Sequence, residues 1–169
     1  MKSEHRESGF LEVFTGIFEF FDEQSAENCG CIGEESSLDR LGPELNHPVW
    51  LVGHMTWLTD SLLAEIPFGK SFRNREWDRF FAAGSKKVED KEYPRFAEVT
   101  ERFASVKKSV AALLDDLKSA DFDKACTALT DWFPTPLDSM LHFVKDANYH
   151  LGQLNYARRA GSAGGSSAE

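Results

Sequence analysis

The 169-residue chain contains 41% hydrophobic and 28% charged residues and carries a formal net charge of −9. This length suits one domain with a hydrophobic core, and no apolar stretch approaches the roughly 20 residues that a membrane-spanning helix needs. The acidic balance argues against nucleic acid as a partner, because such binding depends on lysine and arginine neutralising phosphates.

Residues 8–27 predict an amphipathic helix, because phenylalanine and aliphatic residues recur at steps of three and four between acidic residues. The residues before it are charged and lack the apolar segment of a secretory signal, so we expect a cytoplasmic protein.

A turn-rich connection is predicted over residues 28–45, which contain Gly30, Gly33 and Leu41-Gly-Pro43. Cys29 and Cys31 are separated by one residue and Cys126 lies far away, so neither a disulfide framework nor a zinc knuckle is indicated. We interpret the first two as loop thiols.

The second helix is expected to begin near residues 46–48, with Asn46 as its cap and Pro48 in its opening turn, and to end by Pro67. Trp50, His54 and Trp57 fall in one row of this helix, beside the core-facing stripe.

Residues 67–93 form a long connection rich in aromatic side chains, with a short helix predicted over 75–82. Such a connection is expected to fold over an open end of the core or over a pocket.

A third helix is predicted from residues 93–94 to about Ala120, followed by a short helical stretch over 123–129. The fourth begins with Thr135 as cap, Pro136 at the first position and Asp138 in the first turn, and continues to about Ala160. Residues 1–160 therefore predict an all-α, up-down four-helix bundle in a single domain, with an elaborated connection between helices 2 and 3, and residues 161–169 a flexible tail.

His142, Asp146 and His150 lie one helical turn apart along one row of the last helix, and His54 is the only histidine in a comparable place on another helix. Imidazole and carboxylate are good ligands for Zn, Ni, Fe or Mn, and three protein ligands leave positions open for water or substrate. The residues alone favour the alternative to a metal site. In that alternative a histidine beside the core is simply buried and bonded to a carbonyl, and Asp146 and His150 form an ordinary helical contact.

The surrounding residues favour structural roles. Gln153 and Asn148 are candidates to orient a ligating imidazole, but we expect surface hydrogen bonds. Aromatic residues at helical spacing are more often core than pocket wall, which applies to Trp50, Trp57 and Tyr149. Local basic spots such as Arg73 and Arg158 are interpreted as helix-dipole partners.

Two segments, residues 52–57 (Val-Gly-His-Met-Thr-Trp) and residues 149–159 (Tyr-His-Leu-Gly-Gln-Leu-Asn-Tyr-Ala-Arg-Arg), resemble the DinB-like, YfiT-like family of metalloenzymes. The resemblance implies a four-helix bundle, commonly dimeric, with a divalent metal bound by one histidine of helix 2 and a His-x-x-x-His pair of the last helix. His54 and His150 match the first and last ligands. Asp146 stands where the family has histidine, so the implied ligand set is His54, Asp146 and His150, with His142 in reserve.

The resemblance implies a metal-dependent enzyme similar to thiol-dependent transferases and isomerases, acting on a small molecule with a low-molecular-weight thiol as co-substrate. The alternative is a non-catalytic bundle for self-association or small-ligand binding, with a degenerate metal site. A third, weaker hypothesis is a metal-free acid–base hydrolase in which Asp146 orients His150, although no nucleophile motif such as Gly-x-Ser-x-Gly is present.

Overall fold

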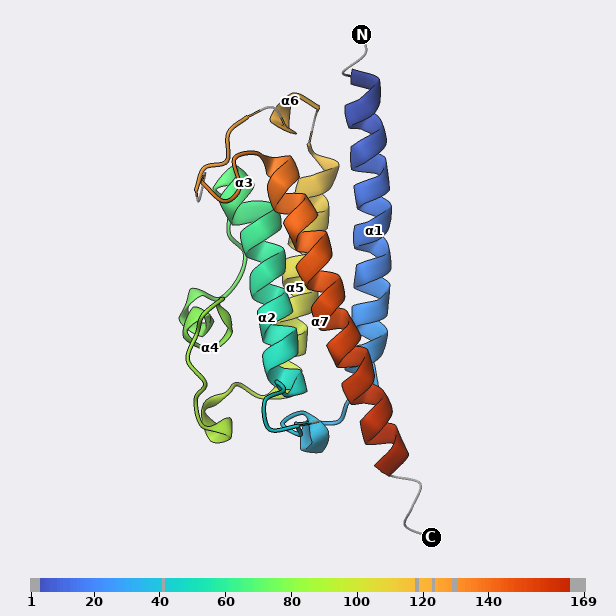
Figure 1. Ribbon diagram of the computed structural model, residues 1–169, viewed down its shortest axis with the longest axis vertical. Coiled ribbons are helices and arrows are strands. Elements are labelled where there is room, and N and C mark those ends of the chain that lie inside the picture. Colours follow the sequence, from blue (N-terminus) through green and yellow to red (C-terminus); the bar gives the residue numbers. More distant parts are fainter. Residues whose placement is uncertain (1–3, 41, 118, 123, 129–130, 165–169) are drawn as a thin grey trace.

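The computed structural model describes residues 4–40, 42–117, 119–122, 124–128 and 131–164. Four long helical segments lie side by side (Figure 1): α1 (Glu4–Gly30), α2 (Pro48–Asp60), α5 (Phe96–Asp115) and α7 (Pro136–Gly164). A π-helical turn η2 (Ser61–Glu65) and a last turn α3 (Ile66–Phe68) extend α2. The shorter elements are η1 (Glu34–Ser36), η3 (Arg75–Trp77), α4 (Asp78–Phe81), η4 (Asp90–Glu92) and α6 (Ser119–Phe122). The predicted all-helical bundle with a long connection between its second and third long helices is confirmed.

The long connection determines the direction of α5. It returns along the bundle to the end where α2 begins, so α2 and α5 run the same way rather than alternating (Figure 1). The side chain of Glu34, between α1 and α2, marks this shared end because its Oε1 accepts the backbone N–H of Phe96 at 2.9 Å.

Phenylalanine side chains fill much of the core between α1, α5 and α7. Phe14, Phe18 and Phe21 of α1 lie against Phe143 of α7, with ring centroids 6.3, 6.0 and 5.3 Å apart, and Phe21 also meets Phe103 of α5. All five are at least 97% buried, and each contributes roughly 1.5–3 kcal/mol of hydrophobic stabilisation.

Several predicted boundaries are wrong by a few residues. The first helix continues to Gly30, so Cys29 lies in its last turn and is half-buried, and burial raises the pKa of the Cys29 thiol to about 11. The cap of α2 is His47 rather than Asn46, because His47 Nδ1 accepts the backbone N–H of Trp50 at 3.1 Å.

At the other end of the bundle, α5 ends at Asp115 and the extra helical turn lies at Ser119–Phe122. Residues 124–128 are not helical, contrary to the prediction for 123–129, whose first and last residues lie outside the described part of the chain. The predicted start of α7 is confirmed, since Thr135 Oγ1 accepts the N–H of Asp138 and Asp138 Oδ2 accepts the N–H of Thr135. The helix continues past Ala160 to Gly164, and residues 165–169 of the predicted tail are not described.

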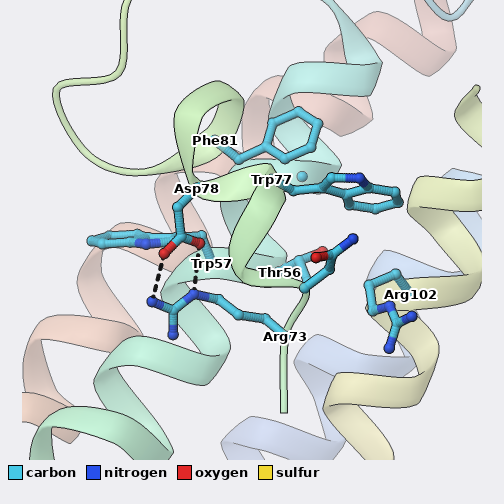
Figure 2. A pocket seen from close by; sticks show the side chains of 9 residues that line it. Thr56, Trp57, Arg73, Trp77, Asp78, Phe81 and Arg102 are labelled. Atoms are coloured by element: carbon cyan, nitrogen blue, oxygen red, sulfur yellow. Dashed lines mark hydrogen bonds and ion pairs between the residues drawn. The ribbon is translucent and has the colours of Figure 1, made fainter. Parts of the chain in front are cut away.

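A buried ionic cluster fastens the connection to α2. The fully buried Asp60 accepts the hydroxyl of Ser71, the N–H of Phe72 and the guanidinium of Arg73, which is itself only 6% exposed. The guanidinium also makes two parallel bonds to Asp78, at 2.8 and 3.0 Å, beside Trp57 (Figure 2). The helix-dipole interpretation of Arg73 is therefore wrong, because Arg73 lies outside any helix and pairs with carboxylates.

Among the described residues, no helix combines the length and the apolar character that crossing a membrane requires.

Candidate functional site

His54 is held rigidly on α2. Its side chain is buried, and its imidazole is stacked between the indoles of Trp50 and Trp57, at centroid distances of 4.5 and 5.8 Å and interplanar angles of 14° and 11°. His54 Nδ1 lies 2.7 Å from the carbonyl oxygen of Phe81. A carbonyl has no proton to give, so Nδ1 donates and the lone pair of the neutral ring is on Nε2.

The local sequence explains this arrangement. Trp50, His54 and Trp57 are spaced by four and three residues, which places them on one face of the helix. A Cβ at Gly53 would overlap the ring of Phe81, so the absence of a side chain there lets the connection pack directly on α2. The connection thus packs directly on α2 beside His54.

His150 of α7 is the second histidine of the site. Its ring lies 4.8 Å from that of His54, at 84°, and His150 Nδ1 donates to Gln153 Oε1 at 2.9 Å. Gln153 therefore orients a site histidine, and the surface role expected for it is wrong. Asn148 does form the expected surface bond, to the carbonyl of Val144.

Asp146 is turned toward the other histidine of its helix. Its Oδ2 lies 2.9 Å from His142 Nε2, one turn earlier, so the Asp146–His150 pair required by the hydrolase hypothesis is not formed. The pKa of both His54 and His150 is lowered by burial, and Asp146 is nevertheless close enough for its charge to oppose that lowering. Within the described residues, no three His, Cys, Asp or Glu side chains converge as a ready metal cage.

Both site histidines are biased toward the neutral form. Burial lowers the pKa of His54 to about 4, outweighing the opposing effects of the Phe81 carbonyl and Asp146. Burial also lowers the pKa of His150, against the opposing effects of its hydrogen bond to Gln153 Oε1 and of the charge of Asp146. Two unprotonated imidazoles from different helices are thus available near neutral pH.

Next to His150, an open groove of about 330 Å³ lies between the start of α2 and the stretch of α7 from Tyr149 to Tyr156. Its lining residues are uncharged: Leu45, Asn46, Leu51, Tyr149, Gly152, Gln153 and Tyr156. The core position expected for Tyr149 is wrong, because Tyr149 is 64% exposed and lines this groove, which no expectation from the sequence included. The signal available in the sequence was a glycine between two tyrosines on one face of a helix.

The sequence pattern of the DinB superfamily matches residues 21–154, which include both histidines of the site and most of the bundle. The chain belongs to the DinB superfamily. The fold is similar to that in the crystal structure of a conserved protein from Enterococcus faecalis. The two chains are 17% identical, the match covers 88% of this chain and 94% of that one, and the TM-score is 0.60. At this identity the likeness concerns the fold alone. The comparison with curated protein sequences gives no match.

Proposed function

We propose that this DinB-superfamily chain is a cytoplasmic, divalent-metal-dependent enzyme similar to thiol-dependent transferases and isomerases, acting on a small-molecule substrate. The observation that carries the proposal is the pair of histidines. Their ring centroids are 4.8 Å apart, and each Nδ1 donates to an oxygen, so the lone pair of each neutral ring is on its Nε2. Orienting a ligating imidazole through its other nitrogen is the usual arrangement around protein-bound metals.

The donor set fits a borderline or hard divalent ion. Two neutral imidazoles with the carboxylate of Asp146 suit Zn, Ni, Fe or Mn, and the carboxylate shifts the preference toward Mn and Fe. Asp146 would exchange its contact with His142 for the metal, and His142 is the reserve ligand. A metal bound here would lower the pKa of a coordinated thiol or water and so supply the nucleophile.

Three features of the structure suit His54 for binding a metal. Trp50 and Trp57 fix the plane of the His54 ring, and the Phe81 carbonyl fixes its tautomer. Burial excludes water from His54 and depresses its pKa, so few protons compete for the lone pair near pH 7.

The test is metal content and metal affinity. We expect untreated protein to hold stoichiometric Zn, Ni, Fe or Mn by elemental analysis, or to take it up by calorimetric titration, and His54→Ala to abolish uptake. Asp146→Asn separates the role of the charge: weakened binding supports a carboxylate ligand, while unchanged binding assigns the third position to His142. Protein that holds no metal and cannot be loaded refutes the proposal.

A homodimer is the second part of the proposal. Adjacent helices α1 and α7 expose Val13, Phe20 and Leu141, which are 62%, 56% and 53% accessible. Large apolar side chains exposed on adjacent helices suit a partner surface. We expect sedimentation analysis to give a dimer for the parent and a monomer for Phe20→Glu, and a monomeric parent would contradict this part alone.

One observation favours a second candidate function, a non-catalytic bundle for self-association or small-ligand binding. Asp146 is already paired with His142, and the described residues contain no group of three His, Cys, Asp or Glu side chains that could hold a metal. A metal that binds only the folded state would stabilise it, so removing that metal would lower the melting temperature. A melting temperature that a chelator does not change, both in the protein as purified and in His54→Ala, would therefore support this alternative.

A further inference from the structure

The groove beside His150 has the dimensions and chemistry of a small-molecule site. Its volume of about 330 Å³ lies at the lower end of the range for small-molecule pockets. No charged side chain lines it, although the chain as a whole carries a net charge of −9. A charged ligand would therefore lose its hydration without gaining an ionic partner.

The walls of the groove favour a planar ligand. Tyr149 and Tyr156 are two turns apart on one face of α7, so their Cα atoms are about 10.5 Å apart along the helix. Gly152 lies between them, and a Cβ added there would meet no atom within 4 Å. The gap is therefore open space between two exposed aromatic rings, above the buried side chain of Leu51. Tyrosine faces and edges bind other aromatic rings favourably.

The polar groups of the groove are two amides, those of Asn46 and Gln153. Gln153 Oε1 is occupied by His150 Nδ1–H. Its NH₂ group makes no hydrogen bond to the residues that the structure describes, so it is free to donate to an acceptor on a ligand. A ligand that accepts this N–H would be connected to His150 through the side chain of Gln153.

We propose that this groove binds a neutral aromatic molecule bearing a hydrogen-bond acceptor such as a carboxamide or ketone oxygen. The ring lies between Tyr149 and Tyr156 over Gly152, and the acceptor receives the Gln153 N–H. This binding requires no metal, so it goes beyond the metal-dependent function and succeeds or fails separately from it.

The proposal is tested by NMR titration of metal-free protein with three molecules of nearly equal shape: neutral benzamide, anionic benzoate and cationic benzamidinium. We expect benzamide to cause saturable shifts at the Gly152 amide, the Gln153 side-chain amide and the His150 ring, and the two ions to bind at least about tenfold more weakly. Absence of saturable shifts up to the solubility limit of benzamide, or equal binding of the ions, overturns the proposal.

A matched pair of variants locates the site. Gly152→Leu fills the groove without a clash at Cβ and improves helix propensity, so it should remain folded and lose benzamide binding at least about tenfold. Gly16→Leu makes the same change at an exposed glycine of α1 that also has nothing within 4 Å of its Cβ, and it should bind as the parent does. If both variants bind benzamide equally well, the ligand lies outside the groove and the assignment is refuted. The assignment is also refuted if a second copy of the chain covers Gly152 and blocks access to the groove.

Discussion

His47 should make the bundle sensitive to mild acid. Its side chain is fully buried, and Nδ1 accepts the first free backbone N–H of α2, from Trp50. The ring must therefore be neutral with its proton on Nε2, which makes no hydrogen bond in the described part of the chain. The His47 ring packs against that of Tyr93, with the ring centroids 4.7 Å apart. Protonation of Nδ1 would destroy the cap and create a buried cation.

The pKa shift sets the size of the effect. Burial is the main cause that lowers the pKa of His47 from 6.5 to about 4, reinforced by Arg40 and Lys87 and opposed by Asp90. The unfolded chain takes up a proton near pH 6.5 and the folded chain only near pH 4, so His47 stabilises the fold fully above pH 6.5. This contribution, on the order of 3 kcal/mol, is lost as the pH falls toward 4.

The assay is urea unfolding followed by circular dichroism at pH 7 and pH 5 for the parent and for His47→Asn. Asparagine is a good N-cap but does not titrate. We expect the loss of unfolding free energy between the two pH values to be smaller in the variant by roughly 2 kcal/mol, while the other histidines titrate alike in both proteins. Equal losses in the two proteins would refute the reasoning.

Three further substitutions test the elements around the site. Gly53→Ala should force Phe81 away from α2 and cost about 1–3 kcal/mol of stability. It should also weaken metal uptake, because the hydrogen bond between His54 and the Phe81 carbonyl would be lost. Gly16→Ala, which adds a Cβ in open space, is the control. Arg73→Met should cost roughly 3–5 kcal/mol because it leaves the buried Asp60 carboxylate without its cation, and Arg73→Met combined with Asp60→Asn should recover part of that loss in urea unfolding. Thr135→Ala removes the cap of α7 and should lower the unfolding free energy by about 1 kcal/mol; an unchanged midpoint would show that Asp138 alone sustains this terminus.

The sequence predicted best where neighbouring residues alone decide the structure. Thr135, Pro136 and Asp138 define the start of α7 through contacts within four residues, and apolar spacing revealed the long helices. The cap of α2 was open to the same reasoning, because Pro48 at the first helical position makes His47 the preceding capping residue. Asn46 is nevertheless the expected cap from composition, because asparagine is a commoner capping residue than histidine.

Long-range contacts were beyond such reasoning. Arg73 meets carboxylates from three different elements, at Asp60, Glu65 and Asp78, and no local pattern indicates that these residues converge. The hydrogen bond from His54 to the Phe81 carbonyl spans 27 residues and depends on a glycine at position 53. The sequence contained both partners of each contact but not the path of the connection that joins them.

Asp146 shows a different limit. It lies four residues after His142 and four residues before His150, so helical spacing offers it two equivalent partners. In the structure it pairs with His142, which also meets the ring of Phe133 at 5.1 Å, while Gln153 occupies the Nδ1 of His150. His142 and His150 thus compete for the Asp146 carboxylate. The loop residue Phe133 contacts His142, and Gln153 binds His150. In the proposed metal site, binding through Asp146 would have to overcome the pairing with His142, so the strength of the Asp146–His142 pair would set how readily the carboxylate becomes available as the third ligand.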